Sequence, residues 1–252
     1  MSISRVTLHN VLNELLQPQG MPDGCPNGLQ IEGRDTIRKI VTGVTASQAL
    51  IDRAIELKAD AIFVHHGYFW KGEDPCLVGM KKQRVASLLK HDISLFAYHL
   101  PLDVHPILGN NVQLANLLEI QDIENLESGK LSIALKGRFA SPLSPQALAE
   151  RLHKVLDKTP LFEQVQKPLI STVAWCTGGG QKYIDLAASQ GIDAFITGEV
   201  SEQTIHSARE MNIHFYAAGH HATERYGAKA VGEYLAQHHD VDVEFVDIAN
   251  PA

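Results

Sequence analysis

The sequence DAIFVHHG at residues 60–67 is the most informative about the fold: four apolar residues, at 61–64, are followed directly by two histidines. A short apolar run between polar residues is typical of a buried strand. The same arrangement recurs before Asp103 and before His220, each of which follows a largely apolar run. Three strands that end in such residues predict an α/β protein whose functional side chains lie in the loops at the strand ends.

Helical and strand patterns alternate along the chain, which also indicates α/β architecture. An internal echo accompanies them, because IDRA (51–54) and DAIFV (60–64) resemble IDLA (184–187) and DAFIT (193–197), 133 residues further on. The residues leave two explanations open. Either all strand–helix–strand units look alike, or a duplication has produced two similar lobes.

We place the lobe boundary in the polar, acidic segment 119–130. The expected first lobe is 1–125, which carries His65, His66 and Asp103. The expected second lobe is 130–252, which carries His220 and Glu224, and segments can be exchanged between the lobes. The alternating segment 241–248 is a predicted last strand that could pair within its own lobe, cross to the other lobe or dock at a subunit interface.

Composition and charge narrow the classes of protein. The 252 residues are 44% hydrophobic and 20% charged, which is ordinary for a globular protein, and the net charge of −7 disfavours a nucleic-acid partner while leaving room for local basic patches. The sequence has neither a membrane-spanning apolar stretch nor a signal-peptide core. Three widely spaced cysteines without a CxxC motif favour a reducing compartment, so we expect a cytoplasmic protein.

His65 and His66 are the first candidate metal ligands. Neighbouring side chains of an extended segment point in opposite directions, so the two imidazoles could serve two ions, or one could bind while the other orients it. His220 and Glu224 are four residues apart at a predicted helix start and share a face. Each pair, taken alone, is more typical of a surface contact.

Asp103 is the third candidate ligand, in a loop that also contains His99 and His105. We interpret these two histidines as groups that orient the ligands or contact substrate. Glu199 corresponds in the echo to the His65 region and could face the metals, so His99 and Glu199 are the candidate catalytic residues. Gly178–Gly180 precedes a predicted helix and could cradle an anion, although a tight turn is the favoured interpretation.

Five ligands exceed the needs of one tetrahedral ion that keeps an open position, and they suit two ions with a bridging carboxylate. Imidazole and carboxylate groups suit Zn, Mn, Fe, Co or Ni. We expect His65 and His220 to favour one ion, His66 and Asp103 the other, and Glu224 to bridge them.

Four strings carry a family resemblance: FVHHG (63–67), HLPLD (99–103), ITGE (196–199) and GHHATE (219–224). In this order they resemble the NIF3 family, also called GTP cyclohydrolase 1 type 2 homologues, and especially its enterobacterial YbgI-type members. The resemblance spans nearly the whole chain. The chain departs from many relatives after the histidine pair, where it has Gly67-Tyr68 and they often have proline. This difference affects the loop more than the ligands.

The resemblance implies two similar intertwined α/β lobes with mixed sheets, a dinuclear metal site between them, and ring-shaped hexamers. It implies the same five ligands: His65, His66, Asp103, His220 and Glu224. We therefore expect a homo-oligomer, specifically a hexamer, since closed symmetric assemblies commonly bury surfaces such as that of the last strand.

The expected function is a dinuclear metal-dependent hydrolase in which the ions lower the pKa of a water molecule. Its small substrate is unknown, and a nucleotide-like one, for a cyclohydrolase or phosphoesterase reaction, rests on the resemblance alone. The cyclohydrolase label is itself an analogy of fold and motif. The alternative is a metal-binding, ring-shaped scaffold or adaptor without turnover, in which the protein fills every coordination position.

Overall fold

The computed structural model describes residues 2–129 and 132–252 of the chain. The expected start of the second lobe, at residue 130, falls outside them. Contacts divide the chain into two compact units. Unit 1 consists of Met1–Gly109 and Gly227–Ala249, and unit 2 consists of Asn110–Tyr226 and Asn250–Ala252.

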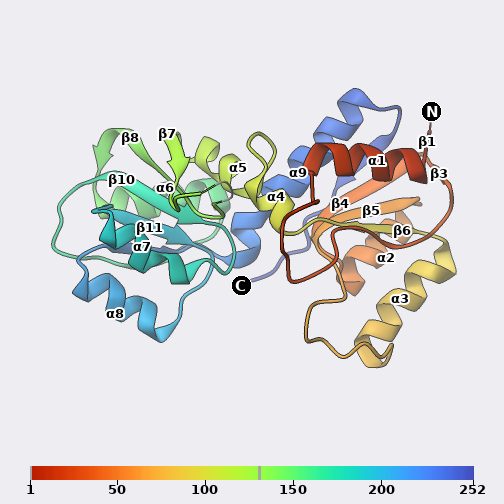
Figure 1. Cartoon of the computed structure of the whole chain (residues 1–252), viewed down its shortest axis with the longest axis horizontal. Helices are drawn as coiled ribbons and strands as arrows, with labels where there is room; N and C mark the ends of the chain where they lie inside the picture. Colours follow the sequence, from red (N-terminus) through yellow and green to blue (C-terminus); the bar gives the residue numbers. More distant parts are fainter. Residues whose placement is uncertain (1, 130–131) are drawn as a thin grey trace. The chain divides into compact units, whose positions relative to one another are not determined.

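Unit 1 is built on a five-stranded mixed sheet with the order β13-β4-β5-β6-β2. Figure 1 labels its strands β4, β5 and β6. The first four strands are parallel, and β2 is antiparallel to β6. A separate antiparallel pair is formed by β1 and β3. The bounds are β1 (Ile3–Ser4), β2 (Gly28–Ile31), β3 (Thr36–Ile37), β4 (Lys39–Thr45), β5 (Ala61–His66), β6 (Ser94–Ala97) and β13 (Asp242–Phe245).

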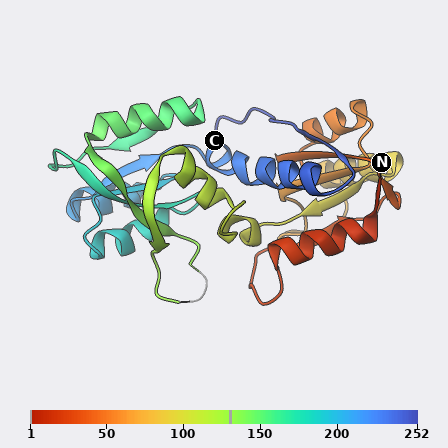
Figure 2. The same cartoon turned by 90° about the horizontal axis from the view of Figure 1, so that it is seen from above.

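Helices cover both faces of this sheet, which is why its central strands carry buried apolar residues on both faces. Phe63 packs in one core with α1 and α9, whereas Ile62 and Val64 pack in another with α2 and α3. Figure 1 shows α1 on one side of β4–β6 and α2 and α3 on the other, and Figure 2 shows α1 and α9 from above. The bounds are α1 (Arg5–Leu16), α2 (Gln48–Glu56), α3 (Gly79–His91), α4 (Leu100–Val104) and α9 (His220–His238).

Unit 2 is built on a six-stranded mixed sheet with the order β7-β8-β10-β11-β12-β9. Its three parallel strands are β10, β11 and β12. The strands are β7 (Ile120–Asn125), β8 (Leu135–Leu143), β9 (Leu161–Glu163), β10 (Ile170–Cys176), β11 (Ala194–Thr197) and β12 (His214–Ala217). The helices are α5 (Asn110–Leu117), α6 (Pro145–Leu156), the 3-10 turn η1 (Gln181–Tyr183), α7 (Ile184–Ser189) and α8 (Glu202–Glu210).

The internal echo corresponds to a shared structural core. Each unit contains a strand–helix–strand–helix–strand segment with three parallel strands, β4-β5-β6 in unit 1 and β10-β11-β12 in unit 2. The repeated strings DAIFV and DAFIT include most of β5 and all of β11. The prediction of two similar α/β lobes with mixed sheets is therefore confirmed.

The two units differ from the linear lobes 1–125 and 130–252, since the chain returns to unit 1 within α9. The cause is the last strand: β13 pairs in parallel with β4, with Val243 opposite Ile40 and Phe245 opposite Thr42. Of the three options for this strand, the second is found, because it crosses to the sheet of the N-terminal half. No helix in the described parts of the chain combines the length and apolarity that a membrane crossing requires.

Candidate functional site

His65 and His66 lie at the end of β5 in unit 1. The Nδ1 of His65, which is fully buried, lies 3.1 Å from the carbonyl oxygen of Tyr98. A carbonyl only accepts, so this Nδ1 carries the proton and Nε2 is the nitrogen that can coordinate an ion. That Nε2 lies 3.5 Å from Oδ1 of Asp103, a buried residue of α4.

The second imidazole is held in a similar way. The Nδ1 of His66 lies 3.1 Å from the hydroxyl of Thr45, the residue opposite it on β4. The ring centroids of His65 and His66 are 4.5 Å apart. The sequence-predicted ligands of unit 1, including Asp103, therefore gather at one end of the parallel strands.

His99 joins this group through a buried carboxylate. Its Nδ1 lies 2.7 Å from Oδ1 of Asp23, and its ring centroid is 5.0 Å from that of His65. His65, His66 and His99 each offer a ring nitrogen within 4.8 Å of the others, which is close enough for a metal ion. The structure thus brings the candidate catalytic residue His99 next to two candidate ligands.

Asp23 is a residue of the site that sequence reasoning missed. Burial raises the pKa of its carboxyl, but hydrogen bonds from His99 and Asn27 outweigh this and lower the pKa to about 2. Its neighbour Cys25 is also buried, and burial together with the charge of Asp23 raises the pKa of that thiol to about 12. Cys25, Asp23 and His99 each offer a ligand atom within 4.8 Å of the others, so this group is also close enough to hold a metal ion.

In unit 2, His220 and Glu224 lie in the first turns of α9. The Nε2 of His220 lies 3.1 Å from Oε2 of Glu224, and its Nδ1 lies 2.7 Å from Oε1 of Glu199. Burial lowers the pKa of His220, but hydrogen bonds and charges of Glu224 and Glu199 outweigh it and raise the pKa to about 9. Glu199 thus contacts a candidate ligand and orients its ring.

The glycine run after β10 forms a tight turn beneath this pair. Gly178 has a φ of +64°, and a Cβ there would collide with Oε1 of Glu224 and lie 3.0 Å from Nε2 of His220. Its amide donates to the hydroxyl of Thr223, and its carbonyl accepts from the amide of Gly198. This geometry agrees with the favoured interpretation, a tight turn. Gly178 has no side chain to collide with Glu224, which approaches the turn closely.

His105 has a local structural part. Its Nδ1 accepts hydrogen bonds from the amides of Ile107 and Leu108, at 3.2 and 2.9 Å. Burial lowers the pKa of His105, so the ring is neutral and fixes the loop after α4. The spacing of His105 from Asp103 in the sequence did not distinguish this structural role from a contact with a ligand or substrate.

Comparisons with known proteins agree with the motifs. The profile of the Duf34/NIF3 (NGG1p interacting factor 3) family matches residues 1–251. A GTP cyclohydrolase 1 type 2 homolog of Pasteurella multocida is 61% identical over 251 residues, which is 99% of this chain and all of that protein. The homolog of Escherichia coli K12 is 54% identical over 246 residues, 97% of this chain and 98% of that protein.

Solved structures show the same relationship. The protein ybgI, described as of unknown function, superimposes with a TM-score of 0.96 at 53% identity, covering 99% of this chain and 100% of that one. A protein of Thermus thermophilus gives a TM-score of 0.90 at 32% identity, with 99% and 100% covered. The resemblance inferred from the four strings is confirmed: the chain belongs to the Duf34/NIF3 family.

Proposed function

We propose that this protein is a metal-dependent hydrolase that holds two divalent ions with His65, His66, Asp103, His220 and Glu224. One observation carries the proposal: each candidate imidazole ligand has an oxygen partner at Nδ1. These partners are the Tyr98 carbonyl, the Thr45 hydroxyl and the Glu199 carboxylate. Metal-ligating histidines are typically oriented in this way, with the other ring nitrogen on the ion.

The donor set fits the proposed group. Three imidazoles and two carboxylates suit Zn, Mn, Fe, Co or Ni better than Ca or Mg, which prefer oxygen ligands. Of the proposed ligands, His65 and Asp103 would hold one ion together, because His65 Nε2 lies 3.5 Å from Asp103 Oδ1, rather than two different ions as expected from the sequence. Bound ions would supply Lewis acidity towards a carbonyl or phosphoryl oxygen of the substrate.

His99 is the proposed acid–base group. Its Nδ1 proton is donated to Asp23, so Nε2 is the position at which it accepts and releases a proton during hydrolysis. The ionised carboxylate of Asp23 holds the ring in one tautomer and stabilises the imidazolium that forms. The name of the relatives favours a purine nucleotide or another small nucleotide-like molecule as substrate, cleaved by cyclohydrolase or phosphoesterase chemistry.

Elemental analysis tests the metal content. Wild-type protein that is purified without chelator and then supplemented should contain close to two divalent ions per chain. Asp103→Ala and Glu224→Ala should each lose most of both ions, because each variant removes a negative charge from a group that the ions share. Glu210→Ala, at an exposed carboxylate of α8, is the matched control. Full occupancy in both ligand variants would contradict the ligand assignment.

Turnover separates the hydrolase from the scaffold alternative. Protein reconstituted with each candidate metal is incubated with GTP, other purine nucleotides and simple phosphoesters, and products are separated by chromatography. The proposal expects a product whose rate falls at least tenfold in His99→Ala with metal content unchanged, the magnitude typical of a lost acid–base group. Stoichiometric metal binding without turnover, and with protein atoms in every coordination position, would instead support a scaffold.

A further inference from the structure

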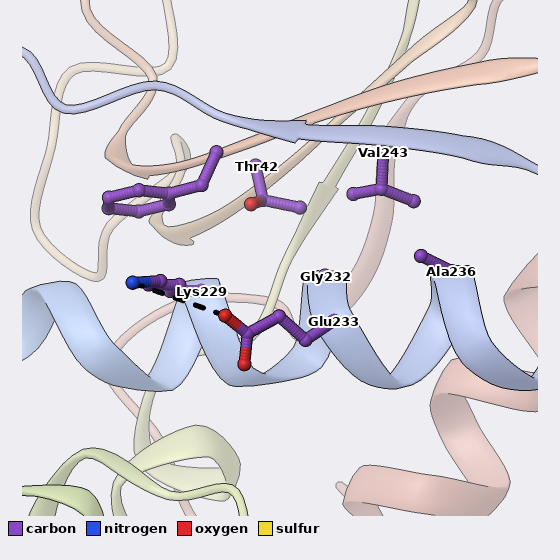
Figure 3. Close-up of a pocket in the computed structure, with 7 residues that line it drawn as sticks. Thr42, Lys229, Gly232, Glu233, Ala236 and Val243 are labelled. Atoms are coloured by element: carbon purple, nitrogen blue, oxygen red, sulfur yellow. Dashed lines mark ion pairs between the residues drawn. The ribbon is translucent and has the colours of Figure 1, made fainter.

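The groove between α9 and β13 in unit 1 leaves no room for a ligand ring (Figure 3). Figure 3 shows Thr42 and Val243 directed from the strands towards α9. A Cβ added at Gly232 would lie 3.0 Å from the Thr42 hydroxyl and 3.1 Å from Val243, so the helix backbone already packs on both side chains. A ligand surface in unit 1 has to be sought elsewhere, and the side chain of Trp70 offers one.

Trp70 belongs to a group of four aromatic rings in unit 1. Its ring centroid lies 4.9 Å from that of His99 and 6.0 Å from that of His66. His65 completes the group, with its centroid 5.0 Å from that of His99. Trp70, His66 and His99 are each partly exposed, whereas His65 is fully buried. The indole therefore lies at the accessible side of the candidate site, beside a proposed ligand and the proposed acid–base group.

Hydrogen bonds of the loop after β5 hold the indole in place. Its Nε1 donates to the carbonyl oxygen of Gly67, at 3.2 Å, and the amide of Trp70 donates to Oε2 of Glu73, at 3.1 Å. The next amide, of Lys71, donates to the carbonyl oxygen of Gly24. Gly24 also lies against the six-membered ring, since a Cβ there would be 3.6 Å from Cε3 of Trp70. A side chain fixed in this way loses little further freedom when a molecule packs on it.

Neither neighbouring histidine stacks on the indole. The plane of the His99 ring is nearly perpendicular to it, at 82°, and the plane of the His66 ring is tilted by 53°. Stacking requires ring planes that are close to parallel, so both imidazoles meet the indole in other geometries. A flat molecule that stacks on the exposed part of Trp70 would have its edge beside His66 and His99.

The surroundings of the indole favour one class of molecule among those that pack on tryptophan. A simple cation is disfavoured, because the ions proposed at His66 would repel it. A sugar needs hydrogen-bond partners for its hydroxyls, and the indole N–H already donates to Gly67. A heteroaromatic base needs only the face of the ring, and such stacking tolerates any base because every base has a flat π-face.

We propose that Trp70 is the platform on which a flat heteroaromatic ring of the substrate stacks, with a purine base as the simplest example. This inference rests on the proposed function, because it takes the bound molecule to be the substrate of the metal site. It also deepens that function, since it places the base, and not only a phosphate, beside His66 and His99. Trp70 is then a residue that determines specificity: molecules with such a ring bind, and simple phosphoesters bind weakly.

Fluorine NMR of the full chain labelled with 5-fluorotryptophan tests the proposal. The chain has two tryptophans, and Trp175 is the internal control, because it is fully buried in unit 2 and its Nε1 donates to the carbonyl oxygen of Asn111. Guanosine supplies a base without phosphate, ribose 5-phosphate supplies phosphate without a base, and choline supplies a cation. Guanosine should shift the signal of Trp70 and leave that of Trp175, whereas ribose 5-phosphate and choline should shift neither.

The same titration without metal separates this inference from the proposed function. Stacking requires no ion, so guanosine should shift the Trp70 signal both in chelator-treated protein and after metal is restored. A shift in a protein that holds no metal and shows no turnover would support the stacking site while the hydrolase failed. Two bound ions and turnover without any shift would overturn the stacking site alone.

Matched variants assign the binding to the ring, with calorimetry as the measurement. Trp70→Leu should weaken guanosine at least tenfold, which corresponds to about 1.4 kcal/mol. Trp70→Phe keeps a smaller ring and should have an intermediate affinity. Phe69→Leu is the control at the neighbouring exposed aromatic residue, whose ring lies under Lys81 with Nζ 5.0 Å from its centroid, and it should leave the affinity unchanged.

Three results would overturn the proposal. The first is an unchanged Trp70 signal with guanosine at millimolar concentration, and because this uses the unsubstituted chain, it does not depend on how a variant folds. The second is an affinity for guanosine that Trp70→Leu, shown to be folded by circular dichroism, leaves unchanged. The third is a shift with ribose 5-phosphate or choline as large as that with guanosine, since the ring would then not be the group recognised.

Discussion

At the scale of single residues, two aspartates explain why the internal echo has a physical basis. Asp60, before β5, accepts hydrogen bonds from the amides of Arg38 and Lys39 at the start of the neighbouring β4. Asp193, before β11, accepts in the same way from the amides of Ser171 and Thr172, near the start of β10. Each carboxylate therefore connects two adjacent parallel strands, which explains why both repeats contain an aspartate at this position.

Asp23 gives a pH-dependent prediction. Its pKa is lowered from 3.8 to about 2 in the folded protein, so its contribution to stability is present above pH 4 and is lost as the pH falls from 4 to 2. At neutral pH the shift corresponds to about 2 kcal/mol, and about half of this should remain at pH 3. We expect Asp23→Asn to be less stable than wild type at pH 6, by a margin that shrinks at pH 3.

Urea unfolding of the metal-free proteins at the two pH values measures this margin. Asp52→Asn, at an exposed carboxylate on α2, is the matched control for the same chemical change. A constant margin for Asp23→Asn would mean that this carboxylate does not titrate differently in the folded state.

Glu199 gives a prediction about ring orientation. Glu199→Gln keeps an oxygen for the Nδ1 proton of His220 but removes a charge, so the pKa of His220 should fall below about 9. Metal affinity should fall about tenfold, the lower end for the loss of a group that orients a ligand. NMR titration of His220 and a metal titration measure the two effects. Glu202→Gln on α8 is the control. If Glu199→Gln left both the pKa of His220 and the metal affinity unchanged, Glu199 would not be orienting this ring.

The candidate ligands could be predicted from the sequence, whereas the residues that hold them could not. His65, His66, Asp103, His220 and Glu224 follow apolar runs, and that signal is local. Asp23 contacts His99 across 76 residues, and no local pattern marks it. Thr45 and Tyr98 could not be predicted for the same reason, because strand pairing alone places them beside the histidines.

At the scale of elements, the parallel strands β4–β6 and β10–β12 were predictable because each contains buried apolar residues and is followed by a helix. Some connections were not. The strand β9 has only three residues and is antiparallel to β12, and β13 pairs with a strand about 200 residues earlier in the chain. Pairing over such separations depends on how the helices pack, so the lobe boundary from composition and the compact units divide the chain differently.

The glycine turn after β10 supplies a prediction at this scale. Gly178 and Gly191 have similar positive φ values, +64° and +75°, but only Gly178 faces side chains. Alanine at either position should cost about 1 kcal/mol for the left-handed backbone. Gly178→Ala should also displace Glu224 and reduce the bound metal, whereas Gly191→Ala should not.

Thermal unfolding and elemental analysis of the two variants make this comparison. If Gly178→Ala retained the metal content of wild type, the close approach of Glu224 to the turn would have no importance for ion binding. If both variants lost metal equally, general destabilisation rather than the displaced carboxylate would be the cause.

At the scale of the whole molecule, assembly is the main prediction. Large apolar residues are exposed close together at the start of α3: Leu77 by 48% and Val78 by 62%, just before the helix, and Met80 by 63%, in its first turn. Isolated exposed apolar residues such as Val6 on α1 are normal, but clustered ones commonly mark an interface. The family resemblance implies a hexamer, so we expect a second copy of the chain to cover this segment.

Light scattering with size-exclusion chromatography should therefore give six times the mass of one chain at micromolar concentration. Placing two carboxylates in a buried interface leaves uncompensated charges, so Val78→Glu combined with Met80→Glu should lower the mass. Val6→Glu, which adds the same kind of charge at a position 58% exposed, should not. A monomer in the wild type would refute the hexamer. If the double variant remained a hexamer, the assembly would be confirmed but its interface would lie away from Leu77–Met80. The edge of β13 would then be the next surface to test, because β13 is the last strand of its sheet and pairs only with β4.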